Sequence, residues 1–263
     1  MAFAQSEGAE LYWESTGAGA PVLLVMGLGM NATGWWRTVP VLSESLRVIA
    51  FDNRGVGRSE VAPGPYSVTQ MADDAIAVLD AAGEKSAHVY GISLGGMIAQ
   101  QIALRHPERV RRLVLGATTP GGTHAVPLDD DVVQFFFRRR DMPAEEACWA
   151  SIPYNYGPRG RREGGQRIAE DIAQRLRFPV RAEGYAAQLE GALHHDVFDS
   201  LERIGHETLV VHGEADRMVP PANGALLAER IRDARLETWP EAGHLYFTDA
   251  PEADVAVLRF LTG

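Results

Sequence analysis

Apolar positions along the chain recur in two alternating patterns, which together predict an α/β fold. Continuous apolar runs, typical of strands buried on both faces, cover residues 21–26, 46–51, 109–116 and 208–212. Apolar residues at helical spacing lie between these runs, as over residues 68–82, where Gly83 follows as a stop signal. Because strands and helices alternate, we expect a mostly parallel sheet with helices on both faces.

Weaker patterns complete this α/β unit at its two ends. Residues 2–14 alternate between apolar and polar and end at Ser15-Thr16-Gly17, which predicts an antiparallel hairpin. A further strand is predicted over residues 235–239. The remaining helices of the unit are expected over residues 35–45, 94–104, 221–231 and 251–261.

The alternation stops between the strand that ends at Gly116 and the strand that begins at Thr208. This block is rich in helical patterns, predicted over residues 128–141, 144–150, 162–177 and 180–193. We therefore divide the chain into an α/β core, residues 1–119 and 201–263, and a helical cap, residues 120–200. An insertion of this kind is the anatomy of a lid over a site.

The best candidate for chemistry is Ser93, in the segment Gly91-Ile92-Ser93-Leu94-Gly95. An apolar strand over residues 87–91 precedes it and a helical pattern follows. Strand, tight turn and helix are the context in which a Gly-x-Ser-x-Gly segment exposes a serine nucleophile. The helix that follows presents free N–H groups to any negative charge that develops there.

A serine nucleophile needs a base, and the base needs a carboxylate to orient it. Asp216 follows the strand at 208–212, and His244 follows the strand at 235–239, so both belong at the carboxyl edge of the sheet. Glu214 is a rival for the acid because it follows the same strand as Asp216. Other histidines have blander interpretations: His212 as a hydrogen-bonded core residue, and His194 and His195 as surface or cap-packing residues.

Backbone N–H groups are the expected donors to the oxyanion of an acyl-transfer reaction. Leu94 directly follows the nucleophile, and Leu28 lies in the glycine-rich segment Gly27-Leu28-Gly29 after the first buried strand. The segment from Asp52 to Ser59 lacks the Lys-Ser/Thr of a phosphate-binding loop, so we interpret it as a charged turn that braces neighbouring loops. Aromatic residues of the cap and of the 35–45 segment are candidates to line a substrate pocket, foremost Trp36, Trp149 and Tyr154. Gly27 is a further candidate for the substrate site.

Composition narrows the partners. The chain has 25 Lys and Arg against 35 Asp and Glu, a formal charge of −10, which argues against nucleic acid or an anionic membrane as a partner. Cys148 is the single cysteine, so no internal disulfide can form. We find no metal-spaced Cys/His cluster, secretory signal or membrane-spanning run in the sequence, and expect a cytoplasmic protein.

These motifs together resemble the α/β-hydrolase superfamily over nearly the whole chain. The likeness rests on Gly27-Leu28-Gly29, Asp52 to Ser59, Gly91 to Gly96, His212 to Asp216 and Gly243-His244. Residues 93–100 are similar to the carboxylesterase and 3-oxoadipate enol-lactonase branch, and Val25-Met26-Gly27 to aclacinomycin-type methylesterases. Met26 departs from the pattern, because many members have His there. The resemblance implies a mostly parallel eight-stranded sheet with a helical cap.

The expected function is hydrolysis of small carboxylic esters or lactones by Ser93, His244 and Asp216, without metal or organic cofactor. The same three residues could instead serve a C–C bond hydrolase, an enol-lactonase or a perhydrolase. A non-hydrolytic binder or cyclase on this fold is a further alternative, and the sequence leaves a homodimer open.

Overall fold

The computed structural model describes residues 2–263 and contains one eight-stranded sheet in the order β1-β2-β4-β3-β5-β6-β7-β8. The strands from β3 to β8 are parallel, while β2 runs antiparallel to both β1 and β4. The predicted mostly parallel sheet with an N-terminal hairpin is therefore confirmed. The strands are β1 (Ala2–Ser6), β2 (Ala9–Thr16), β3 (Ala20–Val25), β4 (Leu46–Phe51), β5 (Ala87–Ile92), β6 (Val110–Gly116), β7 (Thr208–Gly213) and β8 (Ala234–Trp239).

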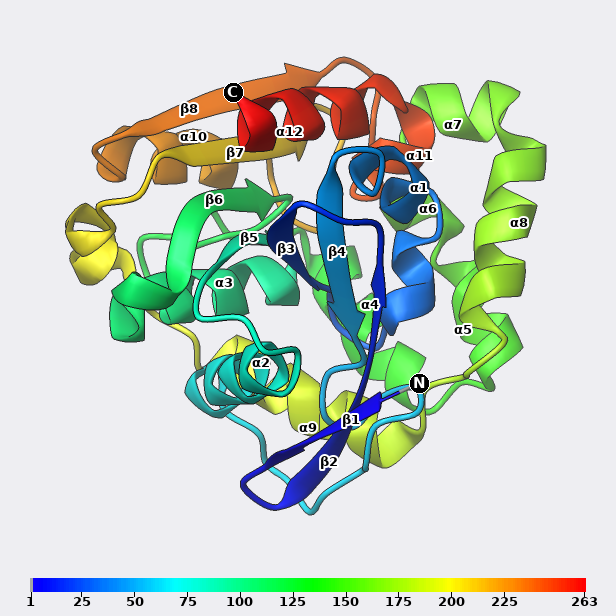
Figure 1. Cartoon of the computed structure of the whole chain (residues 1–263). Coiled ribbons are helices and arrows are strands. Elements are labelled where there is room, and N and C mark those ends of the chain that lie inside the picture. The colour runs from blue at the N-terminus through cyan, green and yellow to red at the C-terminus, as the bar shows by residue number, and fades with distance from the viewer. Residues whose placement is uncertain (1) are drawn as a thin grey trace.

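Helices cover both faces of this sheet (Figure 1). On one face α2 packs against α3, which in turn packs on β5 and β6, and α10 covers β7 and β8; on the other face α1 and α12 pack together. These helices and short turns are η1 (Ala32–Trp35), α1 (Thr38–Leu42), α2 (Val68–Ala81), α3 (Leu94–Arg105), η2 (Pro107–Arg109), α10 (Ala222–Arg230), α11 (Tyr246–Asp249) and α12 (Glu252–Thr262).

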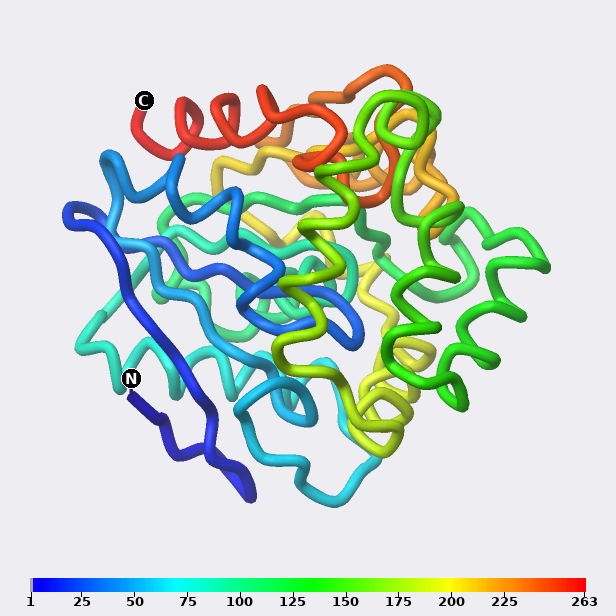
Figure 2. The backbone as a smooth tube through the Cα atoms, turned by 90° about the vertical axis from the view of Figure 1, so that its right-hand side faces the viewer, coloured from blue at the N-terminus to red at the C-terminus, as the bar shows by residue number. Residues whose placement is uncertain are grey.

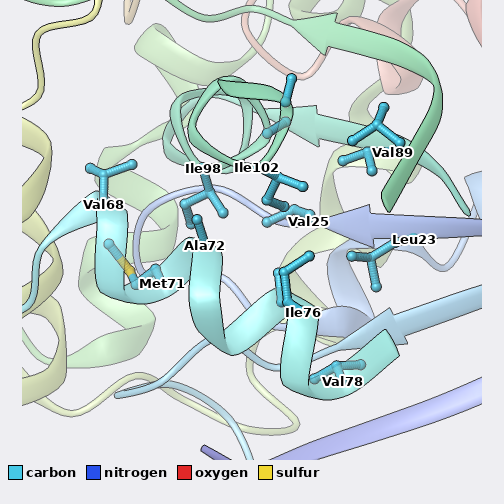
Figure 3. Close-up of a cluster of buried hydrophobic side chains, with 14 of the residues drawn as sticks. Leu23, Val25, Val68, Met71, Ala72, Ile76, Val78, Val89, Ile98 and Ile102 are labelled. Carbon is cyan, nitrogen blue, oxygen red and sulfur yellow. The ribbon is translucent and has the colours of Figure 1, made fainter. Parts of the chain in front are cut away.

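The continuous apolar run of β3 is explained by this two-sided cover. Leu23 and Val25 belong to the core cluster on the α2 and α3 face, whereas Val22 and Leu24 belong to the cluster on the α1 and α12 face. Successive side chains of a strand point to opposite faces, so every position of β3 after Ala20 is buried. Figure 3 shows the first cluster, where Met71 and Ile76 of α2 and Ile98 and Ile102 of α3 lie near β3.

Between β6 and β7 the chain forms helices and no strand of the sheet, as the sequence predicted. Figure 2 shows the helices between residues 130 and 193, in green to yellow-green, gathered at one side of the molecule, away from the N-terminal hairpin. An isolated antiparallel bridge between Gly121 and Asp196 ties the two ends of the segment together. The helices are α4 (Asp130–Arg140), α5 (Ala144–Ala150), α6 (Ile152–Asn155), α7 (Pro158–Glu163), α8 (Gly165–Arg175), α9 (Ala182–Leu193) and η3 (Phe198–Arg203). The exact core and cap limits at residues 120 and 200 stay a prediction.

Two predicted helices are interrupted. The single helix expected over residues 35–45 is divided into η1 and α1, because Pro40 lacks an N–H and is tolerated only in the first turn of a helix. The helix expected over residues 162–177 is replaced by α7 and α8, which meet at Gly164. Among residues 2–263, none of the helices combines the length and apolar character needed to cross a membrane.

Asp254 of α12 is buried beneath Thr38 of α1, whose hydroxyl lies 3.1 Å from both carboxylate oxygens. Burial raises the pKa of Asp254 to about 7, although the hydrogen bond from Thr38 and the charge of Arg167 act in the opposite direction. Because the folded pKa lies above the unfolded value near 3.8, the stability this residue contributes is complete at acidic pH. It is lost as pH rises from about 4 to about 7.

We predict that Asp254→Asn raises the free energy of unfolding at pH 8 by more than at pH 4. At about 1.4 kcal/mol per pKa unit, the difference between the two pH values should be roughly 4 kcal/mol. Urea denaturation of both proteins at both pH values measures it, since other titrating groups cancel in the comparison. An equal effect at the two pH values would contradict the raised pKa.

Candidate active site

Ser93 occupies the turn between β5 and α3, with φ 57° and ψ −123°. This left-handed backbone is strained for a serine, and such strain persists only where the surroundings enforce it. The Ser93 N–H donates to the Gly116 carbonyl (2.9 Å), and the Thr118 hydroxyl donates to the Ser93 carbonyl (2.7 Å). The end of β6 therefore fixes the peptide groups on both sides of the Ser93 side chain.

The two glycines of the turn are required by close backbone approach. A Cβ on Gly91 would overlap the carbonyl oxygen of Gly95, and a Cβ on Gly95 would overlap that of Val25. The strand, the turn and the first turn of α3 therefore pack against each other with no room for side chains. This is the strand-turn-helix arrangement that the Gly-x-Ser-x-Gly segment predicted.

Asp216 lies just after β7, fully buried, and accepts hydrogen bonds on both of its carboxylate oxygens. The N–H groups of Met218 and Val219 donate to Oδ1, at 2.8 and 3.0 Å. On the other oxygen, Oδ2, lie the Nε2 of His212 (3.1 Å) and the Nδ1 of His244 (2.8 Å). Burial alone would raise the pKa of Asp216, but the charge of His244 and the two histidine hydrogen bonds outweigh it and lower the pKa to about 2.

His244 follows β8 and pairs with Asp216 through Nδ1, which leaves its Nε2 on the opposite side of the ring. His244 and Ser93 both line a small cavity of about 20 Å³. Within residues 2–263 no hydrogen bond joins Ser93 Oγ to the His244 ring. The structure thus places Ser93 and His244 at one small cavity, and pairs His244 with the buried Asp216 behind it.

The rival acid, Glu214, is exposed and accepts a hydrogen bond from Thr238 (2.8 Å). Its carboxylate is therefore engaged on the surface of β8 rather than with His244. His212 is buried in β7 as the sequence indicated, and its contact with Asp216 is an additional finding. The four-residue spacing between His212 and Asp216 was the sequence signal for this contact.

The Gly27-Leu28-Gly29 segment lies directly against Ser93. A Cβ on Gly27 would stand 3.1 Å from Ser93 Cβ and 3.6 Å from Ser93 Oγ. Gly27 therefore lies next to the Ser93 side chain and lines the same small cavity. The Leu28 N–H donates to no protein acceptor in the described part of the chain. Leu94 is the first residue of α3, where an N–H has no acceptor within its own helix. Two candidate oxyanion donors therefore flank Ser93.

Polar side chains from the core and the cap hold this loop. The Asn53 amide donates to the Met26 carbonyl (2.9 Å), and the Gly29 N–H donates to Gln188 of α9 (2.9 Å). Gln188 in turn donates to the Arg54 carbonyl (2.8 Å). These contacts hold the loop in place at Met26, the position where the sequence departs from the resemblance noted above.

The Asp52–Ser59 turn is stabilised by charge, as predicted. Asp52 is fully buried, and its carboxylate accepts from the Ala32 N–H (2.8 Å) and from the Arg58 backbone and guanidinium. Ala32 is the first residue of η1, so this hydrogen bond ties the turn after β4 to the segment that follows Gly27-Leu28-Gly29. The turn therefore stabilises the loop next to Ser93, but none of its residues lines either cavity that Ser93 lines.

Ser93 also lines a larger cavity of about 450 Å³. Its wall is largely apolar, with Met97, Phe136 and Met218 among the lining side chains. His195 also lines it; burial lowers the pKa of this histidine to about 4, which keeps the ring neutral near pH 7. His195 is therefore a neutral polar group in the wall of a mostly apolar cavity, and not a surface residue.

The three aromatic pocket candidates do not line the cavities that Ser93 lines within the described residues. Trp36 donates through its indole N–H to Asp171 (2.9 Å), so it is directed toward α8. Trp149 is 49% exposed, and Tyr154 stacks on Phe135 with ring centroids 4.4 Å apart. This corrects their predicted role: aromatic character alone did not distinguish packing and surface residues from lining residues.

Comparison with known proteins agrees with this geometry. Residues 20–147 match the family model described as the α/β-hydrolase fold. A protein of Azorhizobium caulinodans, described as a candidate carbamate hydrolase (RutD), is 35% identical over 96% of this chain and 94% of its own length. The chain belongs to the α/β-hydrolase family.

Solved structures give the same result. The enol-lactonase from Burkholderia xenovorans LB400 has a TM-score of 0.89 and 26% identity, with both chains covered completely. A thermophilic esterase from Thermogutta terrifontis has a TM-score of 0.85 and 28% identity, over 99% of this chain and 97% of the other. Within residues 2–263, no three or more His, Cys, Asp or Glu side chains are grouped so that they could hold a metal ion.

We predict that Gly91→Ala destabilises the fold by on the order of 3 kcal/mol, because the added methyl group has no space beside the Gly95 carbonyl. Gly205→Ala is the matched control, since a Cβ there meets nothing within 4 Å. Its free energy of unfolding should change by less than about 1 kcal/mol. Equal urea midpoints for the two variants would contradict the close packing at the turn.

Proposed function

We propose that this protein hydrolyses carboxylic esters or lactones through an acyl-enzyme on Ser93. The observation that carries the proposal is the placement of the strained Ser93 turn beside a paired His244 and Asp216, around one cavity. The similarity to an enol-lactonase and an esterase supports the same class of reaction. In this proposal His244 is the base, Asp216 its orienting acid, and Leu28 and Leu94 the oxyanion donors.

The first half of the reaction forms the acyl-enzyme. Ser93 Oγ attacks the carbonyl carbon while His244 Nε2 takes the hydroxyl proton. Asp216 accepts a hydrogen bond from the Nδ1–H of His244, which selects the tautomer whose Nε2 is free to act as a base. When the tetrahedral intermediate collapses, the C–O bond to the alcohol breaks and His244 returns the proton to the departing oxygen.

The second half releases the product. His244 removes a proton from water, whose oxygen attacks the acyl carbon and displaces Ser93 Oγ, which regains a proton from His244. A simple ester yields a carboxylic acid and an alcohol, whereas a lactone yields one hydroxy acid because its alcohol remains attached. The N–H groups of Leu28 and Leu94 stabilise the oxyanion in both halves.

The negative charge of Asp216 stabilises the positive charge that His244 acquires during this cycle. A carboxylate with a pKa of about 2 stays ionised through the working pH range and stabilises the imidazolium each time His244 is charged. His212 has Nε2 near both Asp216 and the Val219 carbonyl (3.0 Å), so an Nε2–H at this position donates and holds the carboxylate in place. We expect His212 to position Asp216 without touching the substrate.

Ser93→Ala should reduce kcat for p-nitrophenyl butyrate by about 10⁴-fold or more, because no oxygen remains to form the acyl-enzyme. The urea midpoint should remain close to that of the wild type. Ser43→Ala, at the end of α1 and away from both cavities, serves as the control and should keep full activity. Wild-type rates in Ser93→Ala would contradict the proposal.

Asp216→Asn should lower kcat by about 10³–10⁴-fold, because an amide cannot compensate the charge on His244 or select its tautomer. Glu214→Gln follows the same strand, and it should leave kcat within about twofold because its carboxylate is exposed. Steady-state kinetics with p-nitrophenyl butyrate distinguish the two acids. A larger loss in Glu214→Gln than in Asp216→Asn would reverse their assignment.

A further inference from the structure

The small cavity that Ser93 and His244 line has a further polar residue in its wall, Asn155. Asn155 is the last residue of the cap helix α6, and only 5% of it is exposed. Its side-chain amide takes no part in either half-reaction described above. A buried amide beside the nucleophile and the base therefore lacks a role.

The amide nitrogen of Asn155 is engaged inside the cap. Nδ2 donates to the Ser151 hydroxyl (3.0 Å), and that hydroxyl donates its own proton to the Cys148 carbonyl (2.7 Å). Because this proton is already used, the Ser151 oxygen can only accept from Asn155. The orientation of the amide is therefore fixed, with its nitrogen toward Ser151 and its oxygen away from it.

The amide oxygen of Asn155 is left without a partner. Oδ1 accepts no hydrogen bond from any residue within 2–263, in contrast to Nδ2. It does not belong to the polar atoms that are both unpartnered and fully enclosed, so it has open space beside it. The open space that Asn155 lines is the small cavity, where its oxygen is an available acceptor.

The backbone of Asn155 is attached to the segment that carries His244. The Leu245 N–H donates to the Asn155 carbonyl (2.8 Å), and a Cβ on Gly243 would stand 2.9 Å from the same oxygen. The two segments therefore pack against each other with little space between them.

A buried carboxylate joins the same two segments. Oδ2 of Asp249 accepts from the N–H of Gly157, two residues after Asn155, at 2.7 Å. The same oxygen accepts from the N–H of Gly243, directly before His244, at 2.8 Å. The amide of Asn155 and the imidazole of His244 are thus held in the wall of one cavity.

The small cavity, of about 20 Å³, has room for one water molecule, which needs about 10–15 Å³ and two to four polar partners. The cavity of about 450 Å³ that Ser93 also lines is large enough for an acyl chain. Of the polar side chains at the small cavity, Ser93 becomes the ester, Arg139 has only donors, and His244 takes one proton of the water. Asn155 is the remaining strong acceptor among the lining side chains within residues 2–263.

We propose that Asn155 binds the hydrolytic water of the second half-reaction. Its Oδ1 accepts a hydrogen bond from one O–H of the water while His244 Nε2 removes the other proton, which directs the water oxygen at the acyl carbon. The proton on His244 passes to Ser93 Oγ as the C–O bond to Ser93 breaks, and the released acid keeps the O–H that Asn155 held. The proposal rests on the acyl-enzyme proposed above and adds the residue that favours water as the acyl acceptor.

Methanol tests the proposal, because its single O–H must go to His244 and none remains for Asn155. With p-nitrophenyl butyrate and added methanol, the acyl-enzyme yields either butyrate or methyl butyrate, and chromatography measures their ratio. We expect Asn155→Leu to raise the ratio of methyl butyrate to butyrate by about tenfold, because water alone loses a hydrogen bond. Asn155→Asp keeps an acceptor oxygen, and its ratio should stay within about threefold of that of the wild type.

Labelling of Ser93 by a fluorophosphonate is the control for structural damage. This reaction requires Ser93 and His244 but no water, so its rate in Asn155→Leu should stay within about threefold of that of the wild type. Hydrolysis of the acyl-enzyme should slow by about tenfold in the same variant. If labelling slows as much as hydrolysis and the product ratio does not change, Asn155 is a purely structural residue and the proposal is overturned.

The same experiments separate this proposal from the hydrolytic one. If the wild type neither reacts with the fluorophosphonate at Ser93 nor forms methyl butyrate, the acyl-enzyme fails, and the role of Asn155 fails with it. If the wild type and Asn155→Leu are both labelled at Ser93 and form methyl butyrate and butyrate in the same ratio, the acyl-enzyme stands and the role of Asn155 is refuted.

Discussion

The backbone contact between Gly91 and Gly95 is the constraint on which the site depends. Because neither residue has a side chain, α3 can begin immediately after β5, and Ser93 is forced into its left-handed conformation between them. The same approach brings Gly95 against the Val25 carbonyl and so aligns β3 and its glycine-rich loop with the serine. This one steric condition thus determines the conformation of Ser93. It also determines the positions of the two candidate oxyanion donors, the N–H groups of Leu94 and Leu28.

The ionisable side chains near this turn differ in their charge and in whether the core or the cap supplies them. Asp216 is held ionised by four hydrogen-bond contacts on the core side, whereas His195 is held neutral by burial in the apolar cavity. Arg139, supplied by the cap, lacks any acidic partner. The groups proposed for acyl transfer therefore all lie in the core, whereas cap side chains such as Phe136 line the cavities beside Ser93. A shared fold does not by itself decide which substrate is used.

The sequence predicted the core far better than the cap, for physical reasons. Buried parallel strands produce continuous apolar runs, and Ser93 and Asp216 each follow such a run, whereas His244 follows the weaker pattern of the exposed edge strand β8. The cap helices have a weaker apolar pattern, so the interruption at Gly164 and the residues that line the cavities could not be identified. Arg139 illustrates the limit: three successive arginines look alike, and only the helical phase set by Val132 and Phe135 turns the middle one inward.

The most direct test of the account is to locate the residue that reacts with an active-site-directed fluorophosphonate, by peptide mass spectrometry of the wild type and of His244→Ala. The account predicts one adduct on the wild type, on Ser93, and a greatly slowed reaction once the imidazole is removed. Modification of another residue, or an equal rate of labelling in both proteins, would contradict it, because Ser93 would then not be a nucleophile activated by His244.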